Sequence, residues 1–117
     1  MADEYQVIQV GNIFENIPSG EFPEEIIEIL AQNSSVRIER VISKGHASPK
    51  DFWYDQEQAE LVCVLQGQAE LEFQTEEGGI LRVPMTRGSH LTIRRHQKHR
   101  VVSTSSTEPC VWLTVFF

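Results

Sequence analysis

From Val36 onward, apolar residues fall in short runs separated by turn residues, and the first run has the spacing of a β-strand that buries one face. At the start of one such run, Val36 and Ile38 alternate with Arg37 and Glu39. Many short strands at nearly regular spacing predict an all-β fold, either a sandwich or a closed barrel. The strand-like runs cover residues 36–42, 61–65, 69–73, 80–83, 89–93, 99–103 and 110–117.

Two glycine-containing segments predict turns between these strands. Residues 66–67, Gln-Gly, join the run 61–65 to the run 69–73, and glycine supplies the positive φ that a tight hairpin needs. Residues 76–79, Glu-Glu-Gly-Gly, turn the chain again. We therefore expect the strands on either side of Gly67 to pair as a hairpin.

Only one segment has the spacing of a helix. Apolar residues recur three and four positions apart at Ile26, Ile27, Leu30 and Ala31. Pro23 suits a first helical turn, and three glutamates lie near the start. This pattern predicts a short helix, which must pack on the rest of the protein to be stable. The expected organisation is an N-terminal arm and helix over residues 1–35 and a barrel over residues 36–117.

Composition narrows the class of protein and its partners. The chain has 117 residues, enough for one domain, and a formal net charge of −7, which disfavours nucleic acid and anionic membranes. The first ten residues lack the basic start and apolar run of a signal peptide, and no run of 18 apolar residues follows. We expect a cytoplasmic protein that binds neither nucleic acid nor membrane.

Both cysteines lie inside strand-like runs. A reduced thiol at Cys63 or Cys110 would pack there as a small hydrophobic group. We predict free thiols, with a disulfide or a reactive pair as the alternative.

The sequence contains none of three common catalytic or phosphate-binding motifs, so any functional site must be found among its other polar residues. The chain has no glycine-rich phosphate loop, no CxxC pair and no GxSxG serine elbow. Two clusters remain: Tyr54, Gln56 and Glu60 form the first, and His96 and His99 form the second.

The first cluster resembles the first motif of the cupin superfamily, G-x5-H-x-H-x3-or-4-E-x6-G. Glu60 and Gly67 match, with the required six residues between them. Tyr54 and Gln56 stand where the family has its two histidines, and Ser48 stands at the leading glycine.

The second cluster resembles the second cupin motif, G-x5-P-x-G-x2-H-x3-N. Gly88 and His99 match this motif. Arg94 replaces the proline, His96 replaces the glycine and Ser103 replaces the asparagine.

A subgroup of small bacterial cupins is more similar still. It shares the Phe-Trp-Tyr-Asp-Gln segment of residues 52–56 and the His-x-x-His-Arg-Val segment of residues 96–101. Arg94 and Arg95 depart from the Pro-Ala of that subgroup, at the expected rim of the pocket. The resemblance spans residues 36–117 and implies a double-stranded β-helix, the jelly-roll barrel of cupins.

The resemblance also implies a metal site, because cupins ordinarily bind a metal with three imidazoles and one carboxylate. Here His96, His99 and Glu60 would provide two imidazoles and a carboxylate, with Gln56 as a weak oxygen donor. Such a set suits a divalent ion, Fe, Mn, Zn or Ni. Since glutamine binds metals poorly, a site that has lost its ion stays open, with Gln56 and Glu60 only hydrogen-bonded to each other or to the histidines.

We expect the barrel to bind a small polar or anionic molecule. Trp53 and Tyr54 are candidates for an aromatic wall, although such a pair also suits core packing, and Arg94 is a candidate for attracting an anion at the mouth. In an enzyme, Glu60 or His99 would carry a proton to or from a metal-bound water, oxygen or enolised substrate. The alternative is a metal-free sensor or accessory module, in which the pocket only recognises its ligand.

Strand edges and the apolar C-terminal run of residues 111–117 also predict association between copies of the chain. We expect a homodimer.

Overall fold

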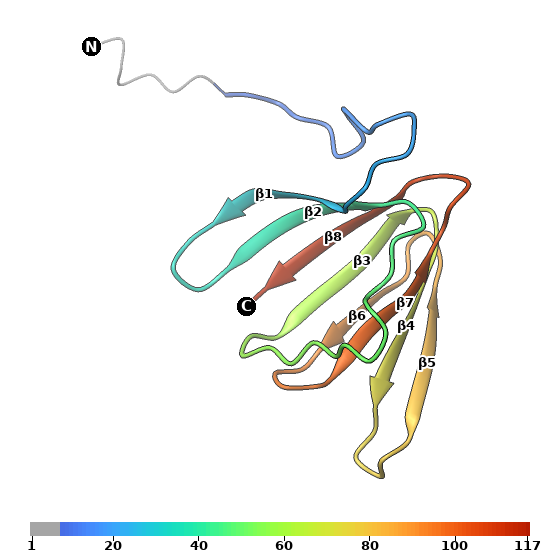
Figure 1. Ribbon diagram of the computed structural model, residues 1–117. Coiled ribbons are helices and arrows are strands. Elements are labelled where there is room, and N and C mark those ends of the chain that lie inside the picture. Colours follow the sequence, from blue (N-terminus) through green and yellow to red (C-terminus); the bar gives the residue numbers. More distant parts are fainter. Residues whose placement is uncertain (1–7) are drawn as a thin grey trace.

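The chain folds as two antiparallel β-sheets that face each other (Figure 1), and the computed structural model describes residues 8–117. The larger sheet has the strand order β1-β2-β8-β3-β6, and the smaller has the order β5-β4-β7. The expectation of an all-β fold is confirmed. The strands are β1 Ile26–Gln32, β2 Arg37–Ser43, β3 Glu60–Gln66, β4 Ala69–Gln74, β5 Ile80–Met85, β6 His90–Ile93, β7 His99–Thr104 and β8 Cys110–Phe116.

The predicted N-terminal helix is wrong, because β1 occupies its place. No helix forms between residues 8 and 117, and Ile26 to Gln32 pair antiparallel with β2, from Ile26 opposite Ile42 to Gln32 opposite Arg37. Isoleucine is branched at Cβ and favours strands over helices, and a helix this short has little stability of its own. The hydrogen bonds offered by the edge of β2 therefore override the helical spacing.

The seven other predicted runs coincide with β2 to β8 to within one or two residues. The predicted hairpin at Gly67 is nevertheless wrong, because β3 pairs with β6 and β8 while β4 pairs with β5 and β7. Gly67 has the expected positive φ of 80°. Its turn carries the chain from one sheet to the other instead of folding a strand back on its neighbour.

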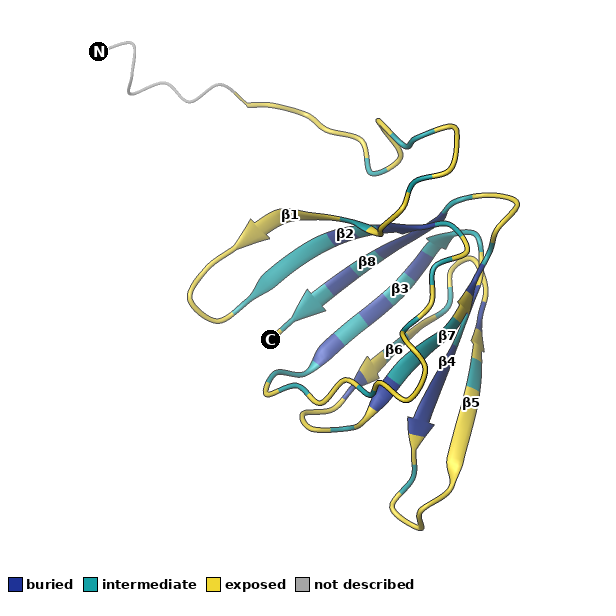
Figure 2. Cartoon of the chain, viewed as in Figure 1, coloured by how far each residue is buried: buried dark blue, intermediate teal, exposed yellow. Residues whose placement is uncertain are grey.

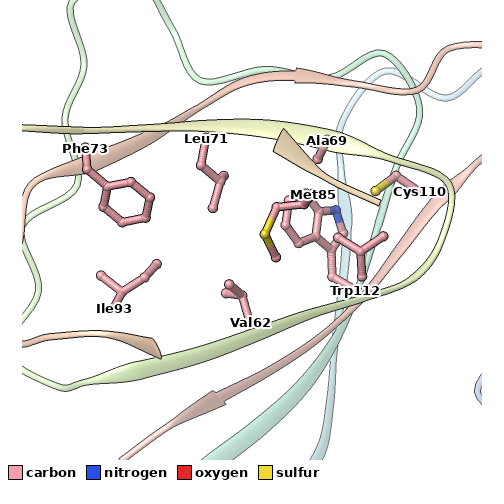
Figure 3. Packing of buried hydrophobic residues seen from close by; sticks show 9 residues of the cluster. Val62, Ala69, Leu71, Phe73, Met85, Ile93, Cys110 and Trp112 are labelled. Atoms are coloured by element: carbon pink, nitrogen blue, oxygen red, sulfur yellow. The ribbon is translucent and has the colours of Figure 1, made fainter. Parts of the chain in front are cut away.

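The hydrophobic core fills the space between the sheets. Figure 3 shows Val62 and Ile93 of the larger sheet pointing toward Leu71 and Phe73 of the smaller one. Met85 and the other members of the cluster continue this layer toward one end of the barrel. Burying each such side chain contributes about 1.5–3 kcal/mol, so this layer fixes the separation of the two sheets.

The C-terminal apolar run does not provide a free edge. Residues 110–116 form β8, which pairs with β2 on one side and β3 on the other. The two edges of the larger sheet are β1 and β6, and the side chains of β1 are mostly exposed (Figure 2). Edge-to-edge association through this sheet would therefore use β1 or β6.

A buried arginine holds the N-terminal arm on the larger sheet. Arg40 forms an ion pair with Glu28 of β1, and its Nη1 donates hydrogen bonds to the carbonyl oxygens of Ile13 at 2.9 Å and Glu15 at 2.6 Å. Further along the arm, the Glu25 carboxylate accepts a hydrogen bond from the hydroxyl of Ser43, the last residue of β2. The arm thus brings Glu25 to the end of the barrel.

Both cysteines are free thiols, as predicted. Cys110 is fully buried, and burial, with the nearby carboxylates of Glu25 and Glu108, raises the pKa of its thiol to about 12. No helix in the described part of the chain is long and apolar enough to cross a membrane.

Candidate functional site

A cavity of about 170 Å³ lies between the two sheets. Its size is close to that of a cavity of about 150 Å³ that accepts benzene. Most of its wall is apolar and comes from Ile27, Val41, Val62, Leu71, Ile93, Val101, Trp112 and Phe116. The polar residues of its wall are Glu25, Glu39, Tyr54, Gln56, Glu60, His99 and Thr114.

Glu60 and His99 meet in this cavity from opposite sheets. Glu60 begins β3, His99 begins β7, and the Nε2 atom of His99 lies 3.7 Å from Oε1 of Glu60. Only 10% of the Glu60 side chain and 6% of the His99 side chain are exposed. The fold thus brings these two motif residues to one interior point.

Tyr54 holds His99 in place through its backbone and its ring. The Tyr54 amide donates to the His99 carbonyl at 2.8 Å, and the His99 amide donates back at 3.2 Å. The His99 ring stacks with the rings of Tyr54 and Phe73, whose centroids are 5.4 Å and 6.0 Å away. Two aromatic rings therefore help to fix the imidazole.

The hydrogen bond on the far side of the His99 ring determines its tautomer. Nδ1 lies 2.9 Å from the carbonyl oxygen of Gln97, and since a carbonyl only accepts, Nδ1 carries the proton. Burial lowers the pKa of His99 and keeps the ring neutral. The unprotonated Nε2 thus faces Glu60.

The surroundings of the Glu60 carboxyl change its acidity. Burial, followed by the negative charge of Glu39, raises its pKa to about 7. A hydrogen bond from Gln56 and the charge of Arg37 act in the opposite direction. Both forms of Glu60 are therefore present near neutral pH, and the protonated form presents its acid to a neutral imidazole.

Two buried oxygen atoms of the cavity wall have no hydrogen-bond partner among residues 8–117. They are Oε1 of Gln56 and Oγ1 of Thr114, and Thr114 as a residue is only 5% exposed. Tyr54 adds its phenol, whose pKa is raised by burial and then by the charges of Glu25 and Glu60, so it stays protonated. The wall thus offers two acceptor oxygens that the described residues do not pair.

Three of the predicted site residues lie outside the cavity. The ring of His96 is 60% exposed and its Nδ1 lies 2.8 Å from Oδ1 of Asp55. Arg94 is exposed on the same loop. Trp53 is half-buried, with the Arg100 guanidinium 5.8 Å from its ring centroid, and does not line the cavity.

His96 still contributes through its backbone. Its φ of 61° is uncommon for a residue with a side chain, and its amide donates to the carbonyl of Gln56 at 2.7 Å. His96 therefore positions Gln56 and does not reach the cavity with its imidazole.

Sequence reasoning missed three polar residues of the wall, Glu25, Glu39 and Thr114. Strand alternation carries a signal for two of them. Thr114 lies on the same face of β8 as Trp112 and Phe116, and Glu39 lies two residues before Val41 on β2. Glu25 had no such signal, because its position depends on how the arm crosses the sheet.

The comparisons identify the family. The sequence model of the Cupin domain matches residues 39–116. The chain is a cupin. No curated protein sequence matches it.

Several solved structures are similar to this cupin in fold. A protein of Ralstonia eutropha JMP134, named a "putative mannose-6-phosphate isomerase", is 41% identical, with a TM-score of 0.85 over 93% of this chain and 97% of that one. A cupin superfamily protein of Desulfitobacterium hafniense DCB-2 is 14% identical, with a TM-score of 0.72 over 95% and 93% of the two chains. HppE in its Fe(II) form is 16% identical, with a TM-score of 0.66 over 100% of this chain and 58% of that one.

The metal site of the cupin family keeps its location here but not its donors. Tyr54, Gln56, Glu60 and His99 stand at the four ligand positions of the family motifs, and all four line the cavity. Of these four residues, only His99 provides an imidazole and only Glu60 a carboxylate. Within residues 8–117, no three His, Cys, Asp or Glu side chains are placed to hold a metal ion. A neutral amide and a protonated phenol are poor replacements for imidazoles, so these residues do not fit the family's metal.

Proposed function

We propose that this cupin binds a small polar molecule in its cavity through hydrogen bonds and without a metal ion. The observation that carries the proposal is the pair of unpartnered oxygens, Gln56 Oε1 and Thr114 Oγ1, beside Glu60 and His99. A buried polar atom without a partner costs about 1–3 kcal/mol. A ligand that donates hydrogen bonds to these oxygens offsets that cost.

The apolar part of the wall supplies the rest of the affinity. Trp112 and Phe116 of β8 and Val62 of β3 form part of a surface against which a compact hydrocarbon skeleton packs. Pockets that bind small molecules are usually lined in this way, by apolar side chains with a few polar groups that fix the orientation.

The charges of the wall argue against an anionic ligand. Glu25, Glu39 and Glu60 line the cavity, and no lysine or arginine lines it among residues 8–117. A sugar phosphate, the substrate class in the name of the Ralstonia protein, is an anion and would meet these carboxylates. We therefore propose neither that activity nor the anionic ligand suggested by Arg94, which lies on the loop outside.

Proton transfer on the bound molecule is a second candidate function. It is supported by the arrangement of a carboxyl with a pKa of about 7 opposite an unprotonated imidazole nitrogen 3.7 Å away. A general acid or base works best when its pKa is close to the working pH. Glu60 and His99 are therefore the residues to which we assign any catalysis.

We also propose that the protein is a homodimer that pairs through β1. This edge strand has an unpaired side, and Ile27, Ile29 and Leu30 are large apolar residues exposed on it. An unpaired edge is a template for a strand of another copy. The cytoplasmic location and the absence of nucleic-acid and membrane partners stay predictions.

Binding is tested with cyclopentanol on protein treated with a chelator. This probe has a hydroxyl and a hydrocarbon ring close to benzene in size. We expect it to raise the melting temperature and to shift the amide resonances of Glu60, His99 and Thr114, because a ligand stabilises the state that binds it.

Thr114→Val removes one unpartnered oxygen at nearly constant volume and should weaken the binding of cyclopentanol. Thr92→Val, the same substitution on the exposed face of β6, is the control. Resonance shifts that avoid the cavity, or equal affinity in wild type and Thr114→Val, would contradict the proposal.

A further inference from the structure

The charged groups of the cavity wall are all acidic. Glu25 reaches it from the arm, Glu39 from β2 and Glu60 from β3. Among residues 8–117, His99 provides the one titratable nitrogen of the wall, and its lowered pKa keeps it neutral. Three elements that are distant in sequence thus bring carboxylates to one small space.

Arg37, a basic residue nearby, cancels only part of this charge. Arg37 pairs with Glu39 at 2.8 Å, but its guanidinium lies over the Phe116 ring, 4.4 Å from the centroid, and does not line the cavity. Glu25 accepts a hydrogen bond from the Ser43 hydroxyl and has no basic partner in the hydrogen bonds and ion pairs of residues 8–117. The potential inside the cavity therefore favours a positive ligand.

Aromatic rings complete the environment that a cation requires. Tyr54, Trp112 and Phe116 all contribute to the wall. The faces of such rings attract ammonium groups, most strongly where water is excluded. The unpartnered Oγ1 of Thr114, in a residue only 5% exposed, is a further acceptor for an N–H group.

We propose that the cavity recognises a small organic cation, an alkylammonium ion of about the size of benzene, with its N–H groups directed at the carboxylates and at Thr114. The hydrocarbon part of the ion packs against the apolar wall and the aromatic rings. This inference rests on the proposed function of the cavity and names the chemical class of its ligand.

Three probes with one ring and different charges test the inference. They are cyclopentylamine, which is a cation at neutral pH, cyclopentanol, which is neutral, and cyclopentanecarboxylate, which is an anion. We expect the amine to bind about tenfold or more tightly than the alcohol, because ion pairs in a partly buried site are worth more than 1 kcal/mol, and the carboxylate not to bind. Affinities come from titrations followed by protein NMR, which also locates each probe.

Substitutions that each remove one negative charge show which carboxylates attract the amine. Glu25→Gln and Glu39→Gln should each lower the affinity for the amine by about three- to tenfold. The affinity for the alcohol should stay unchanged, since only the amine carries a charge. Glu24→Gln removes the same charge from the neighbouring exposed residue and should leave both affinities unchanged. Circular dichroism of each variant checks that the fold is retained.

The outcomes separate this inference from the proposed function. If the alcohol binds in the cavity and the amine binds no more tightly, the cation inference is wrong while the binding function stands. If no probe shifts the cavity resonances, both are wrong. If the affinity for the amine falls equally in Glu24→Gln and Glu25→Gln, the amine responds only to the net charge of the protein. This outcome also overturns the inference.

Discussion

Glu60 and His99 start two strands in opposite sheets, and the fold brings Oε1 of one to 3.7 Å from Nε2 of the other. Each is held by its own surroundings. His99 is fixed by Gln97, Tyr54 and Phe73, and Glu60 is buried beside Gln56. Because the imidazole is neutral and the carboxyl has a pKa of about 7, this pair links the stability of the barrel to pH.

Glu60 should make the protein less stable as the pH rises from about 4.5 to about 7. Its pKa in the folded state, about 7, lies above the ordinary value of 4.5, so the fold favours the protonated form and loses that contribution when the carboxyl ionises. The expected loss is on the order of 2–3 kcal/mol. Urea unfolding at pH 5 and pH 8 measures it.

Glu60→Gln isolates this contribution from that of His99. The lowered pKa of His99 acts in the opposite direction, since its protonation at acid pH favours the unfolded chain. In Glu60→Gln the fall in unfolding free energy toward pH 8 should disappear, while Glu57→Gln, at an exposed residue, should behave as wild type. The same pH profile in wild type and Glu60→Gln would show that Glu60 ionises normally.

Two substitutions should restore the metal site of the family. Tyr54 and Gln56 line the cavity at the positions of the two missing histidines, so the double variant Tyr54→His, Gln56→His completes a set of three imidazoles and one carboxylate. We expect it to bind one equivalent of Zn²⁺ at least about 100-fold more tightly than wild type. Competition with a coloured chelator gives the affinities.

A pair of exposed residues away from the other histidines provides the control for this gain. Gln32→His together with Ser34→His adds two imidazoles outside the cavity and should not create a tight site. If wild type itself holds one tight equivalent, and His99→Ala releases it while His46→Ala does not, our view of the donor set is wrong.

The strands could be predicted because their alternation is local, but their pairing could not. The runs that became β3 and β4 were recognised on either side of Gly67, yet they belong to different sheets. A glycine with positive φ permits a hairpin and a crossing between sheets equally well. At β1 the helical spacing was real, and the hydrogen bonds of β2 outweighed it.

The same limit applies to the site. The cupin motif spacing located Gln56, Glu60 and His99 in one cavity, because the spacing encodes the fold. His96 lies three residues before His99 but occupies a turn with positive φ, and this directs its ring toward Asp55. Glu25 could not be found because its place depends on the path of the arm over the sheet.

Gly67→Ala should destabilise the protein strongly. A Cβ atom at this position would lie 2.6 Å from Oγ of Ser105, 2.8 Å from the carbonyl oxygen of Pro109 and 2.9 Å from Cα of Cys110, and φ is 80°. We expect a loss of at least about 3 kcal/mol in the free energy of unfolding, from strain and contact together. Urea unfolding gives the value.

Gly78→Ala separates backbone strain from steric contact. Gly78 has a similar φ of 84°, but a Cβ there would have no atom within 4 Å. Its substitution should cost only about 1 kcal/mol. Equal losses in the two variants would mean that the turn between the sheets relaxes around the new methyl group.

The proposed dimer makes Ile29 of β1 a contact residue. Ile29 is 52% exposed on β1, one of the two edges of the larger sheet, so pairing with a second copy would bury it. Light scattering should give a mass of about 27 kDa for the wild type, twice the 13.4 kDa of one chain, and about half of that for Ile29→Lys, because a buried charge without a partner opposes association. Ile80→Lys alters an equally apolar residue, 59% exposed on β5 at the edge of the other sheet, and should leave the dimer intact. A monomeric wild type, or dissociation caused by Ile80→Lys and not by Ile29→Lys, would rule out pairing through β1.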